Sequence, residues 1–89
     1  MRVVSGFIVR EIAGEIVAVP TGEAARSLSG IITLNGCGRY LFEKLQTDQT
    51  PESLVDALLE EYDTDRQRAE KDVDAFLSLL QRYGFLENA

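Results

Sequence analysis

Apolar residues cluster in two short segments near the start of the chain. Phe7–Ile12 and Glu15–Pro20 are rich in β-branched residues and are separated by Ala13 and Gly14, a pattern typical of a β-hairpin. Gly14 adopts positive φ at little cost but Ala13 does not, so we expect a turn longer than two residues. Pro20 has no N–H group and is expected to close the second strand. The first third of the chain is therefore predicted to form an antiparallel hairpin.

A third extended segment, residues 31–34, joins this hairpin to the rest of the chain. Gly30 opens it, and Asn35 directly after it belongs to a residue type that commonly caps helix N-termini. Residues 21–29 are small or polar without a clean period, and we interpret them as a connection. The third segment is therefore predicted to be the last strand of the sheet, with a free edge beside the helical part.

Apolar residues recur at helical spacing after Asn35. A first helix follows this residue despite two glycines near its start. A second helix begins at Thr50, where a capping hydroxyl is followed by Pro51 and by Glu52, an acid beside the positive helix end. The positions expected to face the core are Tyr40, Leu41, Phe42 and Leu45 in the first helix, and Leu54, Val55, Leu58, Leu59 and Tyr62 in the second.

A third helix is predicted to begin near Thr64 or Asp65. Thr64 and Gln67 have the spacing of a capping box. The helix is expected to run to Tyr83, because Gly84 directly after it is a typical stop signal. The last apolar residues, Phe85 and Leu86, are expected to fold back onto the core.

Three strands followed by three helices predict a fold of the α+β class. We expect a winged-helix-like architecture in which a three-stranded antiparallel sheet precedes three helices. At 89 residues the chain is predicted to be a single domain over residues 1–89, with little room for a deep enzymatic cleft. A binding module is the better expectation for a chain of this size.

The apolar face of the third helix is wider than packing on one side requires. At about 100° per residue, Leu79 and Ala75 lie beyond one margin of the main stripe. Arg68, Asp72 and Arg82 border this wider flank. Two interpretations stay open: Leu79 packs under the sheet or the first helix, or the flank lines a groove for an apolar segment of another chain. The main stripe consists of Ala69, Val73, Phe76, Leu77, Leu80 and Tyr83.

Composition narrows the function classes. A net charge of −6 argues against attraction to nucleic acid or to anionic membranes. The chain has no His and a single Cys, so it lacks both a His-activated nucleophile and a zinc site of the usual type. Cys37 is either a nucleophile at a helix N-terminus or, as we favour, a small packed residue. No apolar run approaches the length of a membrane span, and we expect a cytoplasmic protein without metal or cofactor.

The chain carries two spaced motifs, Gly30-Ile31-Ile32-Thr33-Leu34-Asn35-x-x-Gly38 and Asp72-Val73-x-x-Phe76-Leu77-x-x-Leu80-x-x-x-Gly84. In order and spacing these motifs resemble the PqqD family. The similarity covers residues 7–86, nearly the whole chain. It implies a non-catalytic domain that binds the leader of a ribosomally made precursor peptide. Such domains present the core of the precursor to a modifying enzyme, often a radical S-adenosylmethionine enzyme.

In this family the leader adds as an extended strand to the third strand and lies against the third helix. Carried onto this sequence, the main chain of Ile31, Ile32, Thr33 and Leu34 would pair with the leader. From the pattern of the third helix we infer the side-chain contacts. Phe76, Leu79 and Tyr83 would offer apolar pockets, Arg68 or Arg82 would meet leader acids, and Asp72 borders the same flank.

Two other functions stay open. A winged-helix domain can act as a DNA-binding transcriptional regulator, but Asp65, Glu70, Asp72 and Asp74 offset the basic residues of the candidate recognition helix. A structural adaptor without a peptide ligand is the third hypothesis. The free strand edge also leaves an edge-paired homodimer open.

Overall fold

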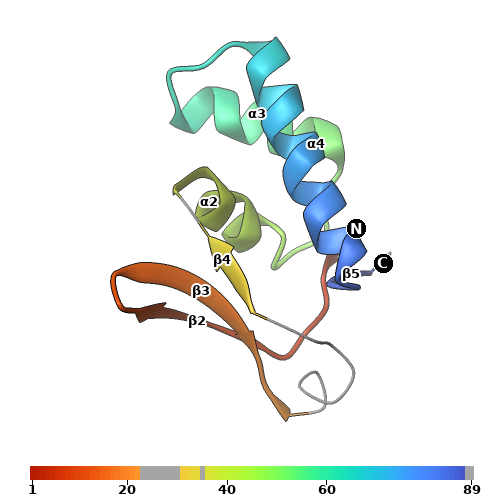
Figure 1. Cartoon of the computed structure of the whole chain (residues 1–89). Helices are drawn as coiled ribbons and strands as arrows, with labels where there is room; N and C mark the ends of the chain where they lie inside the picture. Colours follow the sequence, from red (N-terminus) through yellow and green to blue (C-terminus); the bar gives the residue numbers. More distant parts are fainter. Residues whose placement is uncertain (23–30, 35, 88–89) are drawn as a thin grey trace.

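The computed structural model describes residues 1–22, 31–34 and 36–87 (Figure 1). The predicted roles of Gly30 as the start of a strand and of Asn35 as a helix cap lie outside the described residues, as does most of the predicted connection. The elements along the chain are β1 (Arg2–Val3), β2 (Phe7–Ile12), β3 (Glu15–Pro20), β4 (Ile32–Leu34), α2 (Gly36–Lys44), α3 (Pro51–Glu61), α4 (Arg66–Arg82) and β5 (Leu86–Glu87).

Strands β2, β3 and β4 form an antiparallel sheet in that order, and α2, α3 and α4 follow it in the chain. The sheet lies at one end of the molecule and the helices at the other (Figure 1). This arrangement confirms the predicted α+β class with strands before helices, and it is consistent with a winged-helix-like architecture.

The hairpin turn between β2 and β3 is shorter than predicted. Ile12 pairs with Glu15, so the turn contains only two residues. Ala13 and Gly14 both have positive φ, at 53° and 84°. Such two-residue turns match the right-handed twist of the flanking strands, and this match outweighs a cost of about 1–2 kcal/mol for placing Ala13 in the left-handed region. The expectation of a longer turn was wrong.

Strand β4 is one residue shorter than predicted. Its ladder with β3 pairs Ala18 with Ile32, Val17 with Thr33 and Ile16 with Leu34, so Ile31 lies outside the strand. Within β4 the side chains alternate, because Ile32 and Leu34 are buried while Thr33 is exposed. The buried pair joins the core cluster and fixes the register of the strand.

Side-chain caps begin the two longer helices. At α3 the predicted start is confirmed: the Thr50 hydroxyl accepts from the Ser53 amide at 3.0 Å, and the Ser53 hydroxyl accepts from the Thr50 amide at 2.9 Å. At α4 the cap is Asp65, whose carboxylate accepts from the Arg68 amide at 2.8 Å. The prediction of a capping box at Thr64 was wrong. A carboxylate can accept the capping hydrogen bond as a hydroxyl does, and its charge is in addition attracted to the positive end of the helix.

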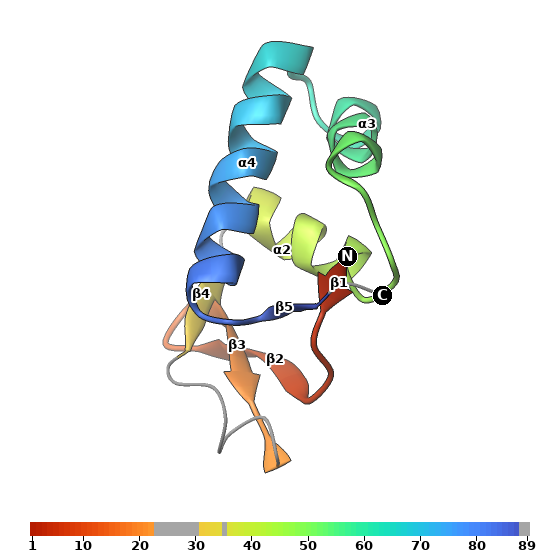
Figure 2. The ribbon, with the colours of Figure 1, turned by 90° about the vertical axis from the view of Figure 1, so that its right-hand side faces the viewer.

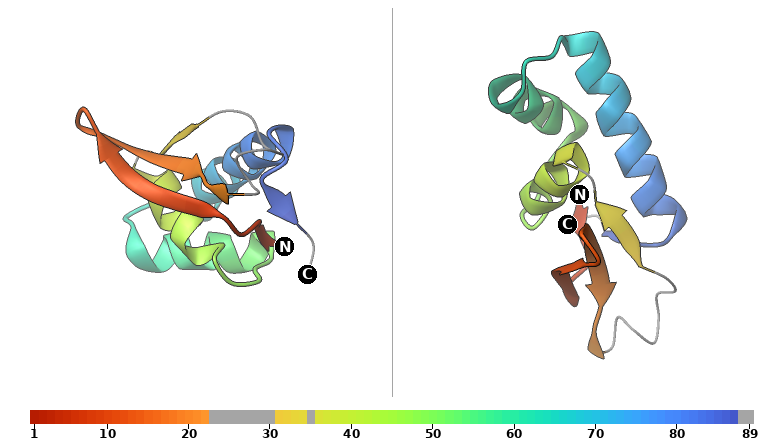
Figure 3. Two further views of the ribbon diagram at one scale, coloured as in Figure 1. Left: turned by 90° about the horizontal axis from the view of Figure 1, so that it is seen from below. Right: turned by 60° about the vertical axis from the view of Figure 1, so that its left-hand side comes forward.

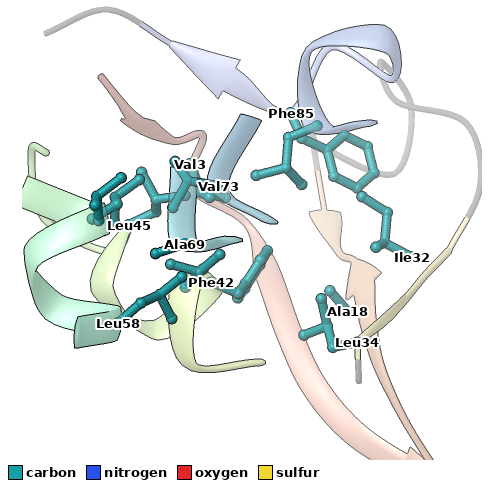
Figure 4. Close-up of a cluster of buried hydrophobic side chains, with 14 residues drawn as sticks. Val3, Ala18, Ile32, Leu34, Phe42, Leu45, Leu58, Ala69, Val73 and Phe85 are labelled. Atoms are coloured by element: carbon teal, nitrogen blue, oxygen red, sulfur yellow. The ribbon is translucent and has the colours of Figure 1, made fainter. Parts of the chain in front are cut away.

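The core lies between the inner face of the sheet and the three helices (Figure 4). Phe85 is fully buried there, which confirms that the end of the chain folds back. Two residues predicted for the core are instead at the surface, since Tyr62 is 39% exposed and Tyr83 is 44% exposed. Each is the C-cap of its helix, α3 and α4 respectively, where the apolar stripe no longer faces the core.

A second small sheet was missed. Arg2 pairs with Glu87 and Val3 pairs with Leu86, so the two ends of the described chain lie side by side (Figure 2). The amide of Val3 also donates to the carbonyl of Leu45, which ties β1 to the end of α2. Strands of two residues carry too little alternation to be recognised from sequence.

Candidate functional site

A cleft of about 510 Å³ lies between the start of α2 and one flank of α4. Because one residue separates β4 from α2, the cleft opens next to the end of β4. In Figures 1 and 3, β4 lies between β3 and α4. From α2 the cleft is lined by Gly36, Cys37, Gly38 and Leu41, and from α4 by Asp72, Ala75, Phe76 and Leu79.

The edge of β4 beside this cleft is unpaired in the described part of the chain. Strand β4 is the last in the sheet order, with β3 on one side only. In an antiparallel strand the N–H and C=O groups point alternately to the two sides, so about half of those of β4 face the open edge. An extended peptide in the cleft could therefore pair with β4 through its main chain.

Most of the apolar lining of the cleft comes from α4. Phe76 and Leu79 are half-buried, pack against the core cluster and also line the cleft, while Ala75 is exposed. Leu79 thus contacts both the core and the cleft. That the cleft receives an apolar segment of another chain stays a prediction. The wider apolar flank of α4 forms the wall opposite the start of α2.

The other end of the cleft is polar. Arg68 lines two adjoining hollows. The first has a volume of about 360 Å³ and is also lined by Lys71, and the second has a volume of about 320 Å³ and is also lined by Cys37 and Tyr62. Asp72 lines both hollows and the main cleft. In the described part of the chain neither Arg68 nor Lys71 forms an ion pair. These two cations can therefore receive an acidic group of a bound peptide.

A hydrogen bond and a ring contact join the α2 wall of the cleft to the end of α3. The Tyr62 hydroxyl donates to the carbonyl of Gly36 at 3.2 Å, and its ring meets the ring of Tyr40 edge-on with centroids 5.7 Å apart. Partial desolvation of the phenol, followed by the nearby Cys37 and Glu61, raises the pKa of Tyr62. Any phenol is protonated at neutral pH, so the Tyr62 hydroxyl can donate this hydrogen bond there, and the raised pKa extends the bond to more alkaline pH.

Cys37 is half-buried in the wall of the cleft. Burial, followed by the carboxylate of Asp72, raises the pKa of its thiol. A reactive cysteine needs the opposite shift, because only the thiolate is nucleophilic. The environment therefore agrees with the favoured interpretation of Cys37 as a packed residue.

The predicted site residues divide into three groups. Asp72, Phe76 and Leu79 line the cleft, and Arg68 lines its polar extension. The open edge beside the cleft is formed by β4, while Ile31 precedes the strand and is 58% exposed. Arg82 and Tyr83 lie at the far end of α4, outside the cleft and hollows found among the described residues; the Tyr83 ring instead lies 6.0 Å from that of Phe85.

The sequence did not identify the wall formed by α2. Gly36, Gly38 and Leu41 line the cleft without having been predicted as site residues, whereas Ala75 belongs to the α4 flank for which a groove was one of the two interpretations. The available signal was the pair of glycines at a helix start, where each costs about 1 kcal/mol relative to Ala. A Cβ atom added at Gly36 would meet nothing within 4 Å, which agrees with its place at an open surface.

Comparison with known proteins identifies the family. The sequence profile of the family described as Coenzyme PQQ synthesis protein D (PqqD) matches residues 15–86, most of the chain. The chain belongs to the PqqD family. This match confirms the family resemblance noted from the sequence motifs. No curated protein matches the sequence closely enough to count as a relative.

Two solved structures share the PqqD-family fold of this chain. One is described as "TbiB1 in Complex with the TbiA(beta) Leader Peptide"; it is 26% identical, with a TM-score of 0.73 over 100% of this chain and 98% of that one. The other is described as "Lasso peptide synthetase B1 complexed with the leader peptide"; it is 20% identical, with a TM-score of 0.70 over 98% and 96% of the two chains. Both similarities extend over essentially the whole of each chain.

Within residues 1–22, 31–34 and 36–87, no group of three or more His, Cys, Asp or Glu side chains is arranged to hold a metal ion. The helices of the same residues are also too short or too polar to cross a membrane.

Proposed function

We propose that this protein is a non-catalytic recognition domain that captures the leader of a ribosomally synthesised precursor peptide. The leader would add to β4 as a further strand and occupy the cleft between α2 and α4. The observation that carries this proposal is that, among the described residues, one edge of β4 is unpaired and the strand ends one residue before the cleft between α2 and α4. TbiB1 has the same fold and is described as a complex with a leader peptide, which supports the proposal.

The two parts of the site would contribute differently to binding. Main-chain hydrogen bonds to β4, each worth about 1 kcal/mol, provide affinity that tolerates changes in leader sequence. Apolar pockets at Phe76 and Leu79 fix the register, because a slip of one residue turns every leader side chain to the other face. Leader recognition would thus depend on few side chains.

The polarity of the cleft also predicts a spacing in the leader. Arg68 and Phe76 lie on the same helix, about 12 Å apart along its axis. An extended strand covers this distance in roughly four residues, and residues four apart point to the same face. We therefore expect the leader to carry an acidic residue about four positions from an apolar residue. Arg82 and Tyr83, which were predicted from the helical pattern, would contact the leader only if it continues past Leu79.

The captured leader would present its core to a modifying enzyme, with a radical S-adenosylmethionine enzyme as the expected type. This role needs no catalytic group in the chain itself. The chain would act as a single domain in the cytoplasm, and a homodimer paired through strand edges is an alternative use of β4 that would compete with the leader.

Isothermal titration calorimetry with the leader of the precursor encoded beside this chain tests the proposal. Binding in the micromolar range or tighter is expected, and a scrambled leader of the same composition should bind at least tenfold more weakly. Equal affinity for both peptides would contradict strand addition in a fixed register. A gel-shift assay at low salt provides the test for the DNA-binding alternative, for which we expect no shift.

A further inference from the structure

A second groove lies on the other flank of α4, where α4 packs against the start of α3. Its volume is about 300 Å³. Val55 and Val73 form a buried apolar floor, and Leu77 is half-buried beside them. We call this feature the α3–α4 groove.

The α3–α4 groove and the leader cleft are on opposite sides of the same helix. At about 100° per residue, the α4 residues that line them point in directions roughly 150° apart. The buried residues Ala69, Val73 and Leu80 lie between these directions and hold α4 on the core. A ligand in the α3–α4 groove would therefore leave the leader cleft open.

Charge around the α3–α4 groove is one-sided. Its rim carries Glu52, Glu70 and Asp74, all exposed. Within the described ranges of the chain, none of these three carboxylates forms an ion pair. The basic residue of the rim, Arg66, is already bound to Asp56 at 3.1 Å. The groove thus combines an apolar floor with a rim of unpaired negative charge.

We propose that the α3–α4 groove docks a basic segment of the modifying enzyme while the leader occupies the opposite cleft. The segment would place an apolar side chain on Val55, Val73 and Leu77, and Lys or Arg side chains against the rim. Charge complementarity selects this occupant. A second copy of this chain, with a net charge of −6, or a nucleic acid would bring like charge to the rim. The inference rests on the proposed function, because it assumes that a modifying enzyme is the partner.

The test uses a double variant that removes two rim charges, Glu70→Gln with Asp74→Asn. Both side chains are exposed, so the fold should be unaffected. The control, Glu11→Gln with Glu15→Gln, changes the net charge equally at exposed positions in the hairpin. The binding of each protein to the purified modifying enzyme encoded beside it is measured by biolayer interferometry, with saturating leader present. Leader affinity is measured separately by calorimetry.

We expect the rim variant to bind the enzyme about tenfold more weakly and the control to stay within twofold of wild type. Leader affinity should stay within twofold in both. Equal enzyme affinity of rim variant and wild type would overturn the inference. So would a loss of leader affinity in the rim variant, which would assign the groove to the leader. A dimer of the chain by light scattering that the rim variant abolishes would assign it to a second copy.

The outcomes separate this inference from the proposed function. If wild type binds the leader but not the enzyme, docking at the α3–α4 groove fails and leader capture stands. If wild type does not bind the leader at all, the proposed function fails whatever the enzyme measurement gives. Leu77→Ala tests the apolar contact in the α3–α4 groove separately from the charges of the rim. This variant should bind the enzyme about fivefold more weakly and bind the leader with unchanged affinity.

Discussion

Two leucines of α4 provide a matched test of the leader cleft. Leu79 and Leu77 are both half-buried and both pack against the core cluster. Leu79 lines the cleft between α2 and α4, where we propose that the leader binds, whereas Leu77 lines the α3–α4 groove on the opposite flank. Replacing each with Ala therefore makes the same chemical change at comparable burial on two different surfaces.

The magnitudes follow from burial. A Leu→Ala change at a fully buried site costs about 2–5 kcal/mol, so at these half-buried sites we expect each variant to lose about 1–2 kcal/mol of unfolding free energy. Covering a whole Leu side chain is worth about 1.5–3 kcal/mol. The part of Leu79 that faces the cleft should contribute about 1 kcal/mol to leader binding, which corresponds to about a fivefold change in Kd.

Urea denaturation and calorimetry with the leader peptide measure the two quantities. We expect both variants to be destabilised by similar amounts, while only Leu79→Ala binds the leader about fivefold more weakly. The reasoning is refuted if Leu79→Ala binds the leader as wild type does. It is also refuted if both variants lose affinity equally, because the effect would then follow stability and not the cleft.

Other predictions concern the strand edge, the thiol and a helix cap. Thr33→Pro removes an N–H group from β4 and should weaken leader binding at least tenfold. A normal circular dichroism spectrum must show that the sheet of this variant is intact. Unchanged leader affinity in the folded variant would count against strand addition. Because burial and then Asp72 raise the pKa of Cys37, iodoacetamide should label the folded protein at pH 8 more slowly than the protein in urea. Labelling should accelerate as pH rises through the raised pKa of the thiol. Asp72→Asn should lower that pKa and speed labelling, and saturating leader should block labelling. Equal labelling rates in the folded and unfolded protein would contradict the raised pKa. Thr50→Ala removes one half of the capping box of α3 and should cost about 1 kcal/mol in urea denaturation, so an unchanged midpoint would show that the cap is not needed.

Most of the architecture could be predicted because it rests on local patterns. The two apolar, β-branched runs of the hairpin and the capping residues at Thr50 were sufficient to place β2, β3 and α3. The errors arose where two local rules compete. At the hairpin turn, strand twist outweighed the preference of Ala13 for negative φ, and at α4 the charge of Asp65 outweighed the hydroxyl of Thr64.

The candidate site was only half predictable. The α4 wall follows from helical periodicity, because Leu79 and Ala75 lie outside the main apolar stripe. The α2 wall depends on how two helices approach each other in space, and the local sequence hinted at it through no more than the pair of glycines at the start of α2. The same limit explains Tyr83, which continues the stripe in sequence but lies after the last turn of α4. Distant pairing between β1 and β5 was equally invisible to local rules.

The most direct test of leader capture is a titration of the isotopically labelled protein with the leader peptide, followed by NMR. If the leader adds as a strand, the amide signals of Ile32, Thr33 and Leu34 will shift, and amides on the open edge of β4 will exchange more slowly with solvent. The signals of Phe76 and Leu79 should shift with the same saturation curve. Unchanged β4 amides at saturating leader would contradict the central claim, even if the peptide binds elsewhere on the protein.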